Sequence, residues 1–407
     1  MLEENQDKTT HKEERINFLC HTMQGGGLER VVSEIATYFE GTYRTQTFVL
    51  RKDRQRYPLP TPPILLSHCE LRTSKLDTFK MLLESTIQYS IYLLKQKPAL
   101  SMSFGGSTDW VNMVSCLFTR TPCITSFHHN PSKDKDRQHP SLARDILQHI
   151  LNKGYRYISK YTVATSEGIR TTLLNDFHFD PEKVVTIYNP INTKEIDLKK
   201  DEKVIEEIYH TNLPIILSVG WLYHIKGQWH LIRVFAEIQK ILPSKLVICG
   251  VGHPDGQDYT DKYHSLVSKL GLEDKVYFAG WQENPYKYMK NSTVFVHPSL
   301  SESFSNVVAE ALACGVPVVA SDCDFGPREI LDNGEYGLLC TCSEWEYLET
   351  EPLTDAEQDM MDKILLLLAD EELRAEYTLK GLERVKEFDT SKSMEKYGEL
   401  FQKVIKP

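Results

Sequence analysis

Apolar and polar positions alternate along the chain in two successive series of short apolar runs and longer amphipathic stretches. The first series has apolar runs at residues 16–20, 47–50, 100–104, 123–127, 161–165 and 183–188. The second has them at 215–220, 245–250, 275–280, 293–298, 317–322 and 337–340. Strands that alternate with helices are typical of a mostly parallel sheet covered on both faces. We therefore predict an α/β protein with two doubly wound parallel-sheet domains.

Helical spacing is clearest in two places. Between the second and third runs, one apolar stripe recurs at helical intervals before Pro98, and it consists of Phe79, Leu82, Leu83, Ile87, Ile91 and Leu94. Residues 355–405 are helical by the same criterion. We expect the last helix of this segment to pack back on the first domain.

The segment 188–200, "YNPINTKEIDLKK", interrupts the alternation with an Asn-Pro and a run of charges, which favours a linker. A chain of 407 residues also exceeds what one hydrophobic core usually supports. We predict a disordered tail at 1–14, domains at 15–190 and 191–385 that face each other across a cleft, and a closing helix at 386–407.

Composition narrows the class of protein. A net charge of −10 excludes a chain-wide basic field, so nucleic acid is not an expected partner. Nine cysteines without a CxxC motif favour free thiols in a reducing compartment over disulfides or a zinc site. The charged start and the lack of long apolar runs indicate neither a signal peptide nor a membrane span. We expect a cytoplasmic protein.

The segment 133–160 is basic against this acidic background, with seven basic residues and three acidic ones. Such a surplus can attract anionic lipid head groups, although a solvated surface is the usual explanation and the one we favour. Peripheral contact with an anionic membrane, at its inner face, is therefore one expectation for this segment.

The densest chemistry lies in "SLSESFSNVVAEALACGVPVVASD", residues 299–322. Good helix N-caps here are Ser303, Ser305 and Asn306. A short helix is predicted over 306–313, with Glu302 before it and Glu310 in its second turn. Its N-terminus would suit a diphosphate, and two nearby carboxylates would suit sugar hydroxyls. The alternative is a capped surface helix with two solvated glutamates.

Other polar positions follow predicted strands. Lys226 precedes an amphipathic helix and suits phosphate neutralisation, unless it is simply solvated. The glycines of "HTMQGGG", 21–27, allow close backbone approach, but they do not form the G-x-G-x-x-G of a dinucleotide site, and Asp53 is the nearest candidate acid. Asp322 and Asp324 form a D-x-D motif. This spacing can bind a divalent cation, but we favour a structural loop beside the ligand.

Together, these motifs resemble the retaining glycosyltransferases of family 4, also called glycosyl transferases group 1, which have the GT-B fold. The resemblance rests on Glu302-x7-Glu310 with "ALACGVPVVASDCDFGPREI", on "GW…KG" at 220–227, on "CGVG" at 249–252 and on "QGGGLERVV" at 24–32. The motifs occur in the family's order, and the resemblance spans residues 15–405.

The resemblance implies transfer of a hexose or N-acetylhexosamine from a nucleoside-diphosphate sugar, with UDP favoured, to an acceptor hydroxyl with retained configuration. It implies no metal and no cofactor. A Rossmann-like N-terminal domain would bind a glycan or lipid-linked acceptor, and a Rossmann-like C-terminal domain would bind the nucleotide sugar. Cell-surface glycan or glycolipid biosynthesis is the expected setting.

Roles follow residue by residue from the same resemblance. The catalytic candidates are Glu302, which would hold the sugar hydroxyls, Lys226, which would meet the diphosphate, and His128, with His129 as the alternative. Glu310 would hold the ribose. The remaining donor-binding candidates are Gly26, Gly27, Phe304, Ser305, Asn306, Val251, Gly252, Trp281 and Gln282.

One departure from the family pattern is Trp221, which stands where many relatives have an arginine. Another cation such as Arg328 would then serve the diphosphate, or the donor would bind more weakly, or Trp221 would stack on another group. Two alternatives to the transferase stay open. They are a UDP-sugar epimerase of the same fold and a non-catalytic nucleotide-sugar-binding partner subunit.

Overall fold

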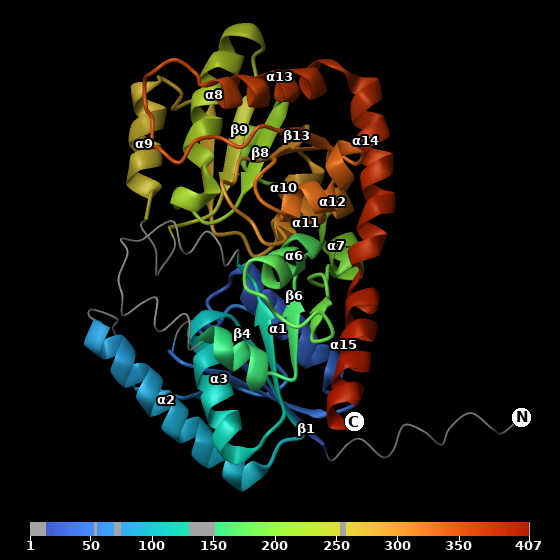
Figure 1. Cartoon of the computed structure of the whole chain (residues 1–407). Coiled ribbons are helices and arrows are strands. Elements are labelled where there is room, and N and C mark those ends of the chain that lie inside the picture. The colour runs from blue at the N-terminus through green and yellow to red at the C-terminus, as the bar shows by residue number, and fades with distance from the viewer. Residues whose placement is uncertain (1–13, 53–54, 69–74, 130–150, 253–257, 407) are drawn as a thin grey trace, which may run out of the picture. The chain divides into compact units, whose positions relative to one another are not determined.

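The computed structural model describes residues 14–52, 55–68, 75–129, 151–252 and 258–406. Two compact units divide the chain: Met1–Pro190 with Ser391–Pro407, and Ile191–Thr390. Each unit is an α/β fold around one parallel sheet (Figure 1). The predicted tail lies outside the described residues apart from Glu14, and so does most of the basic segment, residues 133–150.

The first unit has a seven-stranded sheet in the order β3-β2-β1-β4-β5-β6-β7. Its strands are β1 Arg15–Cys20, β2 Arg44–Val49, β3 Ile64–Leu65, β4 Leu100–Phe104, β5 Cys123–Phe127, β6 Tyr161–Ala164 and β7 Val184–Thr186. All pairings are parallel, as predicted. The sequence pattern missed β3, because two residues at a sheet edge make no apolar run.

The helices described in the first unit are α1 Gly27–Phe39, α2 Lys75–Gln96, α3 Gly106–Thr119, α6 Glu167–Asn175 and α15 Thr390–Ile405. The chain returns to this unit through α15, whose apolar residues enter the core beside β1 and α1. Phe401 lies 5.0 Å from Phe39 between ring centroids. The unit boundary falls at the start of α15, so residues 386–390, placed with the closing helix by the sequence pattern, belong to the second unit.

The long helix α2 forms where its spacing predicts it, yet its apolar stripe faces outward. Phe79, Leu83, Ile87, Ile91 and Leu94 are between 47% and 61% exposed. The buried face carries other apolar residues, Met81 at 3% and Leu93 at 1% exposure, together with hydroxyl groups. The Tyr89 hydroxyl bonds with Ser101 of β4 and accepts from Asn17 of β1. An apolar stripe on a helix ordinarily faces the core. Helix α2 has apolar residues on both faces, and the stripe read from the spacing is the exposed one.

The second unit has a six-stranded parallel sheet in the order β10-β9-β8-β11-β12-β13. Its strands are β8 Ile215–Val219, β9 Lys245–Cys249, β10 Val276–Gly280, β11 Val294–His297, β12 Val318–Ser321 and β13 Leu338–Cys340. All six were predicted as apolar runs. Its helices are α7 Thr193–Lys199, α8 Gln228–Ile241, α9 Thr260–Lys269, α10 Tyr286–Lys290, α11 Asn306–Cys314, α12 Gly326–Ile330, α13 Asp355–Ala369 and α14 Glu371–Arg384.

The linker predicted at 188–200 is wrong over most of its length, because residues 193–199 form α7. The Asn192 side chain caps this helix by accepting from the amide of Glu195 at 3.0 Å. A second asparagine of this segment, three residues after the Asn189-Pro190 that suggested a break, therefore begins a helix. The unit boundary nevertheless falls at Pro190, immediately before it.

A buried charge cluster joins α8 to α13. Glu357 of α13 accepts from Arg233 Nε at 2.8 Å and lies 2.7 Å from His230 Nδ1, and all three side chains are almost fully buried. Burial alone would raise the pKa of Glu357, but the hydrogen bonds from His230 and Arg233 lower it to about 2. These contacts anchor α8, which begins directly after the loop that carries Lys226.

Candidate functional site

The candidate donor residues lie at the carboxyl edge of the six-stranded sheet, where loops of parallel α/β sheets bind ligands. Lys226 ends a short 3₁₀ turn, His224–Lys226, after β8, and Glu302 lies in the loop after β11. Since β8 and β11 are neighbours, the two loops meet. The Ser299 hydroxyl and the Leu300 amide donate to the Ile225 carbonyl at 2.9 and 2.8 Å, which ties the loops together.

Glu302 is the centre of a small polar cluster. Lys226 Nζ donates to Glu302 Oε1 at 2.6 Å. His297 Nε2, at the end of β11, lies 3.0 Å from the same oxygen and 3.0 Å from Ser305 Oγ. The carboxylate is therefore held from two sides before any ligand arrives. His297 was not singled out from the sequence, although a polar residue ending an apolar strand just ahead of Glu302 was a usable signal.

Lys226 and Glu302 each favour the charged form of the other. Burial alone would raise the pKa of Glu302, but the Lys226 charge and the His297 hydrogen bond outweigh it and hold that pKa well below its usual range. Burial alone would lower the pKa of Lys226, and the Glu302 carboxylate raises it instead. Both groups are charged at neutral pH. The Lys226 side chain is 22% exposed and that of Glu302 11% exposed.

The loop geometry needs a glycine after Lys226. Gly227 has φ 61°, in the left-handed region, and a Cβ there would lie 2.2 Å from the carbonyl oxygen of Pro298. That contact is far too short for any side chain. The close approach of Gly227 to the β11 loop is what brings Lys226 beside Glu302.

Helix α11 starts at Asn306, as predicted, and ends one residue later than predicted, at Cys314. Its N-cap residue, Ser305, has φ 77°, and the Ser305 hydroxyl bonds His297 in place of a capping bond to the helix. Phe304 is buried with its ring 5.3 Å from that of Phe388, which fixes the turn. Glu310, in the second turn, is 5% exposed.

The residues assigned to the base by resemblance lie in loops that bond to one another. The Leu222 amide donates to the Val251 carbonyl at 2.8 Å, and Leu222 forms a parallel bridge with Gly252. Trp281 follows β10 and stacks obliquely on Trp221, with ring centroids 5.4 Å apart at 41°. Next to it, Gln282 Nε2 donates to the Ala279 carbonyl at 2.6 Å.

These contacts bear on the missing arginine. Arg328 Nε donates to Asp322 Oδ1 at 2.8 Å, so its charge is engaged within its own loop. The second acid of the D-x-D motif, Asp324, accepts from Ser301. Trp221 packs against Trp281 with the two ring planes tilted by 41°, and weaker donor binding stays a prediction.

The candidates in the first unit lie at the carboxyl edge of its own sheet. Gly26 is the N-cap of α1 and Gly27 its first residue. His128 directly follows β5, and its Nε2 lies 2.9 Å from Ser126 Oγ. Burial, followed by the charge of His129, lowers the pKa of His128 to about 3, so this imidazole is neutral at physiological pH.

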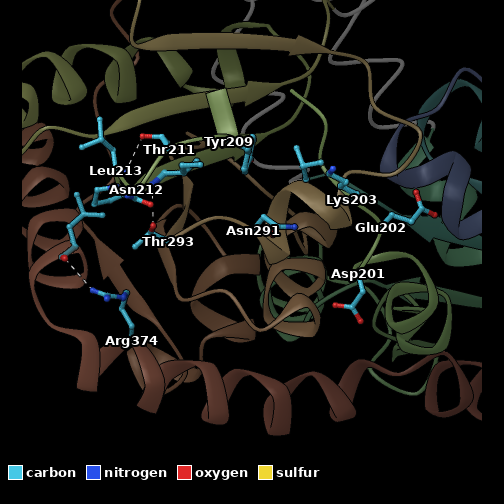
Figure 2. A pocket seen from close by; sticks show the side chains of 14 residues that line it. Asp201, Glu202, Lys203, Tyr209, Thr211, Asn212, Leu213, Asn291, Thr293 and Arg374 are labelled. Carbon is cyan, nitrogen blue, oxygen red and sulfur yellow. Dashed lines mark hydrogen bonds between the residues drawn. The ribbon is translucent and has the colours of Figure 1, made fainter. Parts of the chain in front are cut away.

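A hollow of about 580 Å³ in the second unit lies away from this cluster, at the amino ends of β8 and β11 (Figure 2). Arg374 is its most prominent cation, but Arg374 Nη1 donates to the carbonyls of Leu367 and Leu368 at 2.8 and 3.1 Å. Its charge thus caps α13. The hollow contains none of the candidate residues.

No group of three or more His, Cys, Asp and Glu side chains within the described residues is arranged to hold a metal ion. None of the helices in the described part of the chain combines the length and apolar character needed to cross a bilayer.

Comparison with known proteins identifies the family. The model of "Glycosyltransferase Family 4" matches residues 25–195, and that of "Glycosyl transferases group 1" matches residues 199–383. An uncharacterized glycosyltransferase of Methanocaldococcus jannaschii is 33% identical over 323 residues, which cover 72% of this chain and 75% of the relative.

Two further relatives match over nearly the full length. One is the N-acetylgalactosamine-N,N'-diacetylbacillosaminyl-diphospho-undecaprenol 4-alpha-N-acetylgalactosaminyltransferase of Campylobacter jejuni, 28% identical over 93% of this chain and 97% of its own. The other, Anabaena HepE in complex with UDP-glucose, superposes with a TM-score of 0.77 at 19% identity, covering 96% of this chain and 99% of that one. The chain therefore belongs to the family 4, group 1 glycosyltransferases, and it has their GT-B fold.

Proposed function

We propose that this glycosyltransferase moves a hexose or N-acetylhexosamine from a UDP-sugar to a hydroxyl of a glycan or lipid-linked acceptor, with retained configuration and without a metal or other cofactor. We place it in the cytoplasm, in cell-surface glycan or glycolipid biosynthesis. The observation that carries the proposal is the Lys226–Glu302 ion pair, 2.6 Å long, next to the N-terminus of α11.

This pair can exchange partners when the donor binds. A diphosphate competes with Glu302 for the Lys226 ammonium, and the helix N-terminus adds a favourable dipole. Glu302 then turns its oxygens to the sugar hydroxyls, while His297 still holds it from the β11 side. The site thus offers a cation to the phosphates and an anion to the hydroxyls.

In the reaction, the bond between the anomeric carbon and the phosphate oxygen breaks, and the acceptor oxygen bonds to that carbon on the same face. The departing phosphate gains negative charge, which Lys226 and the α11 amides stabilise, and its oxygen takes the acceptor proton. The carboxylates position and balance charge, unlike the acid and nucleophile of a retaining hydrolase. Because fixed positive groups meet the leaving phosphate, no metal is needed there.

The other roles are carried by the same proposal. Glu310 holds the ribose, the loops of Val251–Gly252 and Trp281–Gln282 hold the base, and Phe304–Asn306 present backbone amides. Gly26 and Gly27 let α1 approach the sugar. The lowered pKa of His128 keeps its imidazole neutral, so that it can donate a hydrogen bond to a substrate hydroxyl or accept one from it.

Nucleotide release from a panel of UDP-, GDP- and ADP-sugars, with and without chelator, tests the proposal. We expect chelator-resistant release from a UDP-sugar, and loss of it in Glu302→Gln and Glu310→Ala. Glu376→Gln is the matched control, because Glu376 forms an ion pair with Lys380 on the surface of α14, away from the candidate residues. The anomeric configuration of the first sugar released, followed by NMR, tests retention.

The alternatives give different outcomes in the same assay. Isomerisation of the donor without any acceptor would assign the epimerase reaction. Tight UDP binding without transfer or donor hydrolysis, even with lipid-linked and glycan acceptors supplied, would assign a binding subunit. This alternative rests on Trp221, which stands where many relatives have an arginine.

A further inference from the structure

The D-x-D motif, Asp322 and Asp324, has no role in the proposed function, and its two carboxylates bond to different partners. Asp322 accepts from Arg328 Nε at 2.8 Å within its own loop. Asp324 accepts from the hydroxyl of Ser301, which lies 23 residues earlier in the chain. This bond, which we call the brace, joins the loop after β12 to the loop after β11 that carries Glu302.

The backbone of Asp324 has a conformation that few residues adopt. Its φ is 45°, in the left-handed region. Residues other than glycine rarely occupy this region, and aspartate and asparagine are the usual exceptions. Such residues persist where the surrounding structure holds them, and they cluster at functional sites. The Asp324 side chain thus meets two demands, because it tolerates this conformation and accepts from Ser301.

The same two loops also meet through their backbones. A Cβ on Gly326 would lie 2.2 Å from the carbonyl oxygen of Phe304 and 2.7 Å from its Cα, so no side chain fits there. Ser301 is 8% exposed and immediately precedes Glu302, and Phe304 follows Glu302 by two positions. The loop after β12 therefore contacts the chain on both sides of the glutamate.

We propose that Asp324 is a positioning residue of the donor site, which acts through Ser301 and sets where the Glu302 carboxylate meets the sugar hydroxyls. This inference rests on the proposed function of Glu302. His297 holds one carboxylate oxygen from the β11 side at 3.0 Å, and the brace holds the backbone from the β12 side. The glutamate is thus fixed at both ends, as a group that must orient a sugar requires.

Nucleotide release from the UDP-sugar that wild type turns over tests the brace. Ser301→Ala and Asp324→Ala should each lose turnover by about tenfold to a hundredfold, as expected for a lost hydrogen bond to a charged group. The double variant should lose no more than Asp324→Ala alone, because both changes remove one bond. Asp324→Asn keeps an acceptor and tolerates the left-handed backbone, so it should retain most of the turnover.

Calorimetry with UDP separates positioning from a general defect of the site. UDP binding should fall far less than turnover in Ser301→Ala and Asp324→Ala, whereas a merely structural defect would weaken both together. Asp332→Ala is the matched control, because Asp332 has the same φ of 45° and is exposed. Both alanines strain the backbone and should lower the melting temperature, but the control should keep its turnover.

Three outcomes of these assays overturn the proposal. The first is that Ser301→Ala keeps the turnover of wild type. The second is that the losses of Ser301→Ala and Asp324→Ala add up in the double variant. The third is that Asp324→Asn loses as much as Asp324→Ala, which would assign the carboxylate to a direct contact with the sugar.

A cycle in thermal stability tests the brace without any substrate. Asp324→Ala and Glu302→Gln should be non-additive in melting temperature, because the brace holds the carboxylate that pairs with Lys226, and this coupling should vanish in a Ser301→Ala background. Asp324→Ala and Glu376→Gln should be additive. If no donor is turned over but the first cycle is non-additive, the proposed function fails and the brace stands. If that cycle is additive, the brace does not position Glu302 and the proposal is overturned for any donor.

Discussion

The carboxyl edges of the two sheets are both formed by loops that follow parallel strands, but their ionisable side chains differ in charge state. In the second unit, burial of Glu302 is outweighed by a lysine and a histidine, so the carboxylate and the ammonium both stay charged. In the first unit, burial prevails. It lowers the pKa of His128 to about 3 and raises that of Asp109 to about 6. Topology places polar residues at an edge, and the presence of an opposite charge within bonding distance decides their charge state.

The difference suggests a division of work. A preformed ion pair suits a charged ligand that can replace one partner, whereas neutral hydrogen-bonding groups suit hydroxyls. We therefore infer that changes to charge will matter most in the second unit and that changes of pH will show first in the first unit.

The largest expected effect is from Lys226→Met. Removing a donor aimed at developing negative charge costs about 10²–10³ in turnover. It also leaves the Glu302 carboxylate buried beside His297 without its cation, so the melting temperature should fall. The double variant Lys226→Met/Glu302→Gln should regain stability without regaining turnover. Steady-state nucleotide release and thermal melts measure the two quantities.

Lys240→Met is the matched control, because Lys240 makes a 2.7 Å pair with Glu237 on the exposed face of α8. It should change neither quantity appreciably. If Lys226→Met keeps most of its turnover, the leaving phosphate is met by another group and the proposed role of Lys226 is wrong.

Gly227→Ala should come next in size. An alanine there must both hold φ 61° and push the Pro298 carbonyl away from 2.2 Å, so the loop that carries Glu302 shifts from Lys226. Backbone strain alone costs about 1–3 kcal/mol. Gly334→Ala is the comparison, since Gly334 has φ 99° with nothing within 4 Å of its added Cβ. Gly227→Ala should lose turnover by about tenfold or more, and Gly334→Ala should lose only stability. Equal turnover in the two variants would show that the loop spacing is not critical.

The sequence predicted the sheets better than the faces of their helices. The runs at 100–104 and 123–127 match β4 and β5 residue for residue, because each combines apolar residues with small hydroxylic ones and follows a proline. The spacing of α2 predicted a helix, but its orientation depends on the Tyr89 hydroxyl meeting Ser101 and Asn17 in the sheet. No local pattern reports such a contact.

The candidate site shows the same limit. Lys226 and Glu302 could be named from motifs, but their 2.6 Å contact joins residues 76 positions apart. His297 gave a weak signal, because it is a single polar residue at the end of the apolar strand β11. Trp221 was noticed as a departure, but its partner Trp281 is supplied by a different strand.

A pH effect should separate His128 from Asp109. The folded pKa of His128 is below that of a free histidine, so the unfolded chain binds more protons between about pH 6.5 and 3 and stability falls as pH drops through that window. Asp109 has a raised folded pKa, so its contribution grows as pH falls below about 6. At pH 5 the loss from His128 is roughly 2 kcal/mol, and the gain from Asp109 offsets part of it.

Melts of single variants between pH 7 and 5 measure these terms. His128→Gln should lose less stability on acidification than wild type, and Asp109→Asn should lose more. His264→Gln, at an exposed ring beside Phe278, is the control and should follow wild type. Parallel melting curves for all four proteins would mean that neither group is shifted as the geometry implies.

The smallest effect is expected at Trp221, where two substitutions separate the contribution of ring packing from that of an added charge. The contact with Trp281 is worth about 0.5–1.5 kcal/mol beyond its buried area, so Trp221→Leu should weaken UDP binding about threefold to tenfold if the pair supports the base loops. Trp221→Arg removes the same contact but adds a cation close to the Lys226 loop. Calorimetry at low and high salt should then show UDP binding that is more salt-sensitive in the arginine variant than in wild type, because screening weakens the added charge and leaves ring packing unaffected. Equal salt dependence in the two proteins would mean that residue 221 does not reach the diphosphate, and the tryptophan would then be a packing residue of the loops.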